Sequence, residues 1–143
     1  MSAHIDICDA VVARLNAAPV GTFSEAFTAA LSFDPTEDRV DLSSLQVDVM
    51  PAAREVVQGT RAKMQETITV SIGIRKQASA SDVTAMKLRH NVVEQIYDYM
   101  AQQSLATYAA AKFSDANISF PAEPLIEDRT FLAVVNVTYL VWR

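Results

Sequence analysis

The sequence predicts an α+β protein, a two-layer sandwich in which a long helix and an N-terminal helix pack on one face of a mostly antiparallel β-sheet. Residues 66–76 alternate between apolar and polar side chains, which is typical of a strand with one buried face. Residues 3–17 and 80–103 repeat apolar side chains every three or four positions, as amphipathic helices do. The length of 143 residues and the hydrophobic content of 50% predict a single α+β domain, residues 1–143.

The remaining segments complete the order α–β–β–β–α–β–β, in which strands joined by short loops are expected to pair antiparallel. Further strands are predicted at residues 23–33, 45–50, 116–120 and 129–142. The last of these is apolar on both faces, so we expect it in the middle of the sheet or against a neighbouring subunit. Residues 51–65 contain Pro51 and Gly59 and have no clear period, so we expect a loop there, with a short helix at 52–57 as the alternative.

The core is expected where the long helix covers the sheet. From the sheet, Val70, Ile72, Val135 and Val137 should lie beneath it. Its buried side is predicted to comprise Val83, Met86, His90, Val93, Ile96, Tyr97 and Met100.

Composition excludes several classes of protein. The single cysteine, Cys8, cannot form an intramolecular disulfide, which excludes a secreted disulfide scaffold. No apolar run is long enough to cross a membrane. Residues 1–10 lack the basic start of a signal peptide. We therefore expect a protein of a reducing cytoplasm that does not interact with membranes.

Two histidines and the cysteine are the first candidates for chemistry. His4 and Cys8 are four residues apart on a helix and could share a metal, but zinc needs three or four ligands and no other soft ligand is near. A surface histidine above a core cysteine is the simpler interpretation. His90 could act as a general base, yet no nucleophile motif accompanies it, so a packed or interface histidine is favoured.

Carboxylates and glycines give no complete site either. Asp34, Glu37, Asp38 and Asp41 could hold a cation, but the calcium-loop pattern and its glycine are absent, which favours a solvated acidic loop. Adjacent carboxylates at 127–128 would point to opposite faces of a strand, so they do not form a matched catalytic pair. Three glycines cannot supply a phosphate-binding loop. We therefore expect no enzyme, no cofactor and no metal site.

Charge is distributed unevenly along the chain, whose net charge is −5. Residues 1–50 hold eight acids and two bases, residues 51–90 three acids and seven bases, and residues 91–143 six acids and three bases. The basic segment could bind nucleic-acid phosphates, meet the acidic loop of a neighbouring copy, or be solvated surface; contact between copies is favoured because the bases are scattered and lack interleaved aromatics. The candidate contact residues are Arg54, Arg61, Lys63, Arg75, Lys76, Glu37, Asp38, Asp41 and Trp142.

The order of these segments resembles the tail terminator and tail-completion (neck) proteins of tailed bacteriophages. The resemblance covers nearly the whole chain. It is carried by IDICDAVVARLNAA, by Phe27-Thr28-Ala29 before the acidic loop with Asp34-Pro35, by VDVMP and an arginine-rich loop, by TITVSIGIRK followed by the helix with LRHNVVEQIYDYM, and by FLAVVNVTYLVWR.

The resemblance implies a virion structural protein, assembled in the host cytoplasm. Such a subunit forms a homo-oligomeric ring, usually a hexamer, at the head-proximal end of the tail tube. The ring stops tube polymerisation and joins the tail to the head connector, and DNA passes through its lumen without sequence-specific binding. Its partners would be the tail tube protein and the neck proteins. In this setting, reversing the charge of Arg54 and Arg61 is expected to weaken the ring, which light scattering after size-exclusion chromatography would measure.

Alternatives remain open at this point. Another neck or head-completion protein would have a similar size and charge. A small-molecule-binding α+β module would need a pocket with converging polar groups, for which Asn136 and Thr138 are the candidates. An enzyme built around His90 would place that histidine in a cleft beside a carboxylate.

Overall fold

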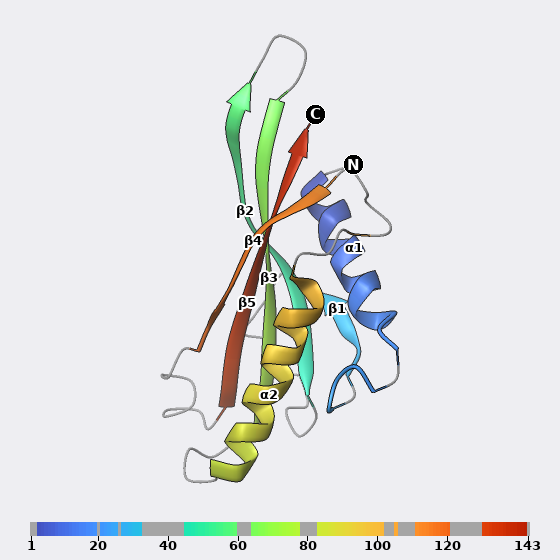
Figure 1. The fold of residues 1–143 in the computed structure, drawn as a ribbon, viewed down its shortest axis with the longest axis vertical. Coiled ribbons are helices and arrows are strands. Elements are labelled where there is room, and N and C mark those ends of the chain that lie inside the picture. Colours follow the sequence, from blue (N-terminus) through green and yellow to red (C-terminus); the bar gives the residue numbers. More distant parts are fainter. Residues whose placement is uncertain are drawn as a thin grey trace.

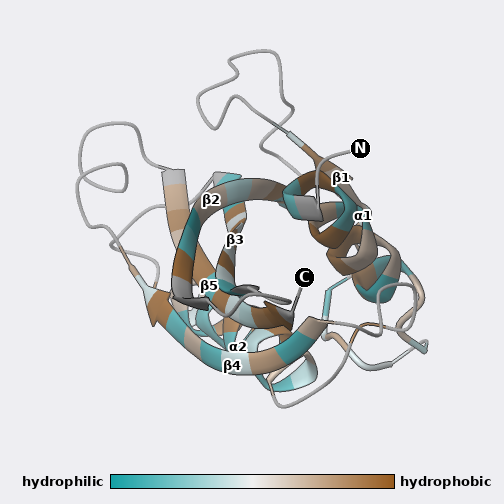
Figure 2. Ribbon diagram, turned by 90° about the horizontal axis from the view of Figure 1, so that it is seen from above, coloured by the Kyte–Doolittle hydropathy of each residue, from teal (hydrophilic) through white to brown (hydrophobic). Residues whose placement is uncertain are grey.

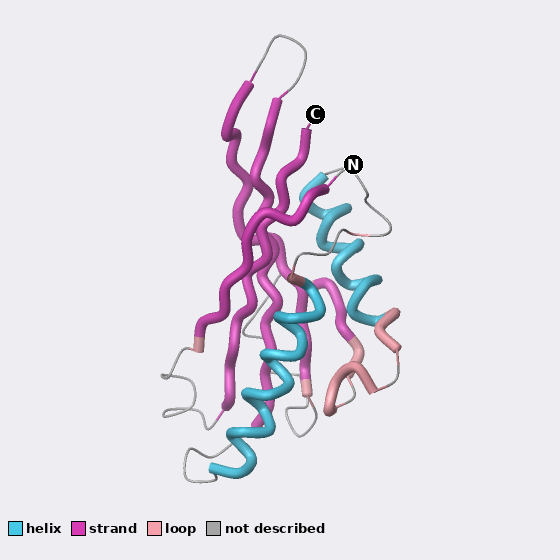
Figure 3. The backbone as a smooth tube through the Cα atoms, in the orientation of Figure 1, coloured by secondary structure: helices cyan, strands magenta, loops and turns pink. Residues whose placement is uncertain are grey.

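The structure is a computed structural model that describes most of the chain, namely residues 3–19, 21–25, 27–32, 45–59, 64–77, 83–101, 105, 111–120 and 130–142. Within these residues, two helices and five strands follow one another in the predicted order (Figures 1 and 3). Their bounds are α1 Ala3–Asn16, β1 Ala29–Leu31, β2 Gln46–Gly59, β3 Met64–Gln77, α2 Val83–Met100, β4 Ala111–Ser119 and β5 Thr130–Trp142. None of the described helices is long and apolar enough to span a membrane.

The five strands form one sheet in the order β1-β2-β3-β5-β4. Three of the four pairings are antiparallel, and β1 pairs with β2 in parallel. The sheet is strongly curved, and α1 lies at the open side of the curve (Figure 2). The mostly antiparallel α+β sandwich predicted from the sequence is therefore confirmed.

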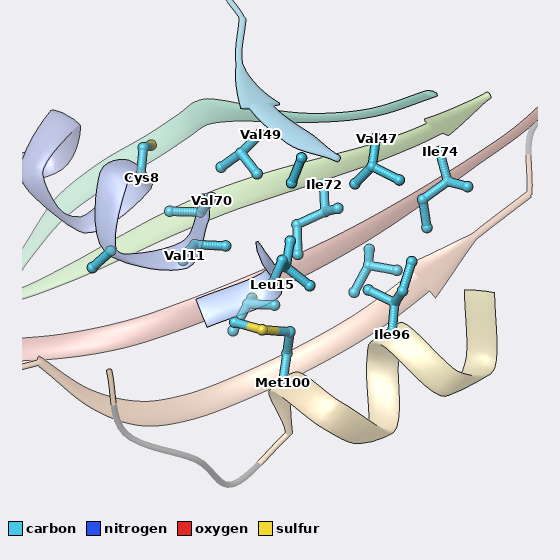
Figure 4. Close-up of a cluster of buried hydrophobic side chains, with 14 of the residues drawn as sticks. Cys8, Val11, Leu15, Val47, Val49, Val70, Ile72, Ile74, Ile96 and Met100 are labelled. Atoms are coloured by element: carbon cyan, nitrogen blue, oxygen red, sulfur yellow. The ribbon is translucent and has the colours of Figure 1, made fainter. Parts of the chain in front are cut away.

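Both helices pack on the same face of the sheet. The helix α1 contacts β1, β2 and β3, while α2 contacts β5 and β4. Cys8, Val11 and Leu15 project from α1, and Ile96 and Met100 from α2, into one cluster with valines and isoleucines of β2 and β3 (Figure 4). The predicted core residues of the sheet are buried and paired across strands: Val70 lies opposite Val137, and Ile72 opposite Val135.

The parallel pairing of β1 differs from the expected antiparallel pairing. Fourteen residues separate Leu31 from Gln46, and a connection of this length lets the chain return to the same end of the sheet. The strand predicted over 23–33 is also wrong in extent, because, of the residues described in that range, Ala29–Leu31 alone form a strand. Phe23 and Phe27 pack against the core as partly buried side chains instead.

The loop expected at 51–65 is wrong over its described residues, which lie in strands. β2 runs without a break to Gly59, and β3 begins at Met64. Register shifts between Pro51 and Ala53 and between Val56 and Gln58 explain the missing period, since each bulge inserts a residue and interrupts the alternation of faces.

Over its described residues, the long helix α2 spans Val83–Met100, within the predicted 80–103, whose outermost residues 80–82 and 102–103 lie outside the description. Of its predicted buried side, Val93, Ile96 and Met100 are buried, and Met86 and Tyr97 pack partly against the core. Val83 and His90 are exposed, contrary to expectation. Val83 begins α2, whose first turn extends past the end of the sheet (Figure 1), and the His90 ring stacks on Phe120 beyond the end of β4.

The remaining predicted strands are found. β5 matches the predicted 129–142 closely and lies between β3 and β4, which accounts for its apolar character on both faces. β4 begins earlier than the predicted 116–120, at Ala111. A bulge between Phe113 and Asp115 hides its alternation in the sequence.

One buried polar group in this core gives a stability prediction. Tyr139 is fully buried, and its hydroxyl has no hydrogen-bond partner among the described residues. Burying a hydroxyl without a hydrogen bond costs about 1–3 kcal/mol. We therefore expect Tyr139→Phe to raise the free energy of unfolding by about 1 kcal/mol, measured by urea denaturation. A loss of stability would show that the hydroxyl has a favourable contact.

Candidate functional site

The described bases that the sequence suggested for contacts between copies each pair with an acid of the same chain. In β2, Arg54 donates two hydrogen bonds to Glu66 of β3, Nε to Oε2 at 3.1 Å and Nη2 to Oε1 at 3.2 Å. This bidentate geometry, in which two N–H groups of the guanidinium donate to the two oxygens of one carboxylate, is the strongest ion-pair arrangement for arginine. The Glu66 side chain is 7% exposed and that of Arg54 34%, so the pair is half sheltered from water.

Two further pairs anchor the other end of β3. Arg75 donates from Nη2 to Oδ2 of Asp48 at 2.8 Å, and both side chains are largely buried. Lys76 pairs with Glu25, which lies in the segment between α1 and β1. These bases therefore hold their own chain together, and their participation in a contact between copies remains a prediction.

The other predicted contact residues cannot be compared with the structure. Arg61, Lys63, Glu37, Asp38 and Asp41 lie outside the described residues, as do Asp34 and residues 127–129. The backbone of Trp142 ends β5, but its side chain is likewise outside the description.

The candidate catalytic and metal-binding residues have ordinary contacts. The His4 ring (Nε2) lies 3.0 Å from the carbonyl oxygen of Thr69, and Cys8 is fully buried, which agrees with a surface histidine above a core cysteine. His90 stacks on Phe120, with ring centroids 4.6 Å apart, and its Nδ1 lies 3.3 Å from Glu94 Oε1. Half of the His90 side chain is exposed, so it packs on one side only, and its place in an interface remains a prediction. Across the described ranges, no three histidine, cysteine or acidic side chains gather to hold a metal.

Cys8 makes the stability depend on pH. Burial, and secondarily the charge of Asp9, raises the pKa of the thiol from about 9 to about 11. The unfolded chain loses this proton first, so the free energy of unfolding falls as the pH rises from about 9 to about 11, with a slope of at most about 1.4 kcal/mol per pH unit. Denaturation at pH 8, 9 and 10 should show a small change in the first interval and a fall of about 1 kcal/mol in the second, and Cys8→Ala should remove this dependence. Burial raises the pKa of Tyr139 as well, but its effect begins above pH 10.

Asn136 and Thr138 belong to a row of polar side chains on the helix-free face of the sheet. Ser71 Oγ donates to Asn136 Oδ1 at 2.6 Å, and Asn136 Nδ2 donates to Asn117 Oδ1 at 3.1 Å. The hydroxyls of Thr69 and Thr138 lie 3.1 Å apart. These bonds link β3, β5 and β4, so the polar atoms stabilise the sheet.

Two hollows in the described surface lie on the helix side and contain neither Asn136 nor Thr138. One of about 300 Å³ lies between the end of α1 and the segment that contains Phe23, Glu25 and Phe27. The other, of about 260 Å³, lies between Ser24 and the middle of α2. Neither hollow therefore contains the two polar side chains that the small-molecule hypothesis named.

The feature that the sequence did not predict is an exposed strand. Every residue from Ala52 to Val56 in β2 is exposed, although all of them belong to the strand, and Val56 is 61% exposed. β1 covers the outer edge of β2 only at Val47–Val49. Among the residues that the structure describes, nothing pairs with the outer edge from Ala52 to Val56, nor with the outer edge of β4. A strand exposed on both faces and along one edge is typical of a contact surface.

No protein-family model and no curated protein matches the sequence. Among solved structures, the fold is similar to the PVC sheath/tube terminator, in the extended state, of an extracellular contractile injection system, with 15% sequence identity and a TM-score of 0.46. The similarity covers 100% of this chain and 57% of that chain, so this chain spans little more than half the length of that protein.

Proposed function

We propose that the chain is a structural assembly protein, a tail terminator that closes into a homo-oligomeric ring and has no enzymatic activity. The observation that carries the proposal is the strand from Ala52 to Val56, which is exposed on both faces and whose outer edge pairs with no other described strand. A sheet that leaves such a strand exposed has a surface suited to association. The element order, which resembles the phage tail terminators, gives the class of assembly.

In this role the ring, a hexamer in the family that the chain resembles, covers the head-proximal end of a tail tube. It satisfies the contacts exposed at the tube end and presents no further tube-like face, so the tube stops growing. The opposite side of the ring meets the head connector in the virion. DNA crosses the lumen without sequence-specific binding, and a net charge of −5 limits adhesion of the DNA.

The test is the mass of the purified particle and its image in projection. Light scattering across a range of concentrations should give a single multiple of the 15.6 kDa subunit, and negative-stain images should show closed rings. A compact monomer at the highest concentration would contradict the proposal. Incubation with a polymerising tail tube should then shorten the tubes, whereas unchanged tube lengths would contradict the terminator role but not the ring.

The charge-reversal test at Arg54 needs a control because of its partner in the same chain. Arg54→Glu would place two carboxylates together at Glu66, which destabilises the subunit itself. The double variant Arg54→Glu/Glu66→Arg keeps the pair with its order reversed. If Arg54 contributes to the ring, the double variant should fold like the parent chain and still assemble weakly. Normal assembly of the double variant would show that Arg54 stabilises the subunit and does not contribute to the contact between copies.

A further inference from the structure

Among the described strands, the outer edges of β2 and β4 are both unpaired at the same level along the strands. Through the strand registers, Glu55 of β2 lies opposite Thr67, Thr67 opposite Leu140, and Leu140 opposite Lys112 of β4. One row therefore crosses the sheet from the open edge of β2 to the open edge of β4, with Glu55 at one end and Lys112 at the other.

The neighbouring rows are also aligned. The row of directly paired residues that starts at Arg54 of β2 ends at Phe113 of β4, and the row that starts at Val56 ends at Ala111. Directly opposite residues of paired strands lie on the same face, so Glu55 and Lys112 both lie on the helix-free face, while Arg54 and Phe113 lie on the helix side. Glu55 and Lys112 are exposed and have opposite charges.

Strand direction agrees with pairing between these edges. β2, β3, β5 and β4 alternate in direction, so β2 and β4 run oppositely. A rotation about an axis along the strands keeps these directions, and the β4 of a neighbouring copy then meets β2 antiparallel, the more stable ladder. The two edges differ, so the contact is head-to-tail and closes into a ring when the rotation suits.

Bulges restrict this pairing to a short stretch. In β2, the register shifts lie on either side of Ala53–Val56, and in β4 one lies between Phe113 and Asp115. Bulges and charges on an edge oppose indiscriminate pairing. A short ladder with one opposite-charge pair then favours one register over others.

We propose that the outer edge of β2 at Ala53–Val56 pairs antiparallel with the outer edge of β4 at Ala111–Asp115 of the next copy, with Glu55 opposite Lys112. The occupant of the open edge is thus a second copy of this chain, and the contact joins the sheets of neighbouring subunits. This inference rests on the proposed function because it specifies the contact that closes the ring.

Engineered disulfides test the contact directly. Within one chain, two strands lie between Glu55 and Lys112, which puts their Cα atoms about 14 Å apart along the sheet, too far for a disulfide. In Glu55→Cys/Lys112→Cys, a mild oxidant should therefore link different copies and give a ladder of covalent oligomers on a non-reducing gel. An equimolar mixture of the two single variants should stop at covalent dimers. The native Cys8 is fully buried and should not react.

Matched variants separate this contact from other ways of associating. Ser119 is also exposed in β4, but its row leads through Val134 and Gly73 to Asp48, far from Glu55. Glu55→Cys/Ser119→Cys should therefore give little cross-linking. Equal linkage in that variant, or covalent dimers from either single variant alone, would overturn the proposed register.

A charge exchange gives a second readout without cross-linking. Glu55→Lys should raise the concentration needed for half-assembly on the order of fivefold, because like charges then face each other. Adding Lys112→Glu should restore it. If light scattering shows a ring while the double-cysteine variant remains unlinked, the proposed edge contact is wrong but the proposed ring is not. If no ring forms at any concentration, the proposed function is wrong.

Discussion

Replacing Ile72 by alanine is expected to lower the free energy of unfolding by about 3–4 kcal/mol. Ile72 is fully buried in the interior strand β3, opposite Val49 on one side and Val135 on the other. Truncation loses the transfer free energy of the missing carbons and leaves a cavity in a part of the core that both helices cover. Urea denaturation at a fixed protomer concentration measures the change, because assembly would otherwise shift the apparent stability.

The matched control is Ile72→Val, which removes one methylene group. Ile72→Val should lower the free energy of unfolding by about 1 kcal/mol and leave the slope of that free energy against urea concentration unchanged. An alanine variant that loses less than the valine variant would mean that Ile72 does not lie in the packed core.

Breaking the Asp48–Arg75 pair is expected to have the second-largest effect, a loss of about 2–3 kcal/mol in Asp48→Ala. The Arg75 side chain is 10% exposed and the Asp48 side chain 16%. Removing one member of a pair so sheltered from water leaves the charge of the other poorly solvated. The pair also lies diagonally across β2 and β3, so its loss weakens the hairpin itself.

A double-mutant cycle isolates the interaction between the two side chains. Arg75→Met preserves much of the apolar stem, and the double variant Asp48→Ala/Arg75→Met should lose less stability than the sum of the two single variants. The difference should exceed about 1 kcal/mol. Strict additivity would show that the pair contributes no coupling.

The parts of the fold that could be predicted from the sequence are those with an uninterrupted period. Residues 67–75 alternate between polar or small and apolar side chains without exception, and residues 3–17 keep one apolar stripe, so both were placed to within a few residues. β2 beyond Pro51 was missed because two bulges shift its alternation, and the parallel pairing of β1 depends on a long connection that carries no periodic signal.

The candidate site was predictable in its composition and not in its contacts. The basic character of residues 51–90 is plain in the sequence, but the partners of Arg54 and Arg75 depend on the hairpin register. Once β2 and β3 are known to close between Gly59 and Met64, Arg54 and Glu66 fall on neighbouring positions, and so do Asp48 and Arg75. Glu55 and Lys112 could not have been connected at all, because their alignment passes through three strand pairings.

The placement of β5 has a consequence for how the chain folds. This strand lies between β3 and β4, although both precede it in the sequence, so β4 is joined to the rest of the sheet only through the pairing of β5 with β3. The residues that meet in that pairing are separated by the whole of α2 and β4, as with Val70 and Val137. Closing so large a loop costs entropy before any burial compensates, and such topologies reach the native state slowly. During that interval the apolar side of the β2–β3 hairpin is accessible, which makes the newly made polypeptide a substrate for chaperones and sensitive to the speed and temperature of its expression.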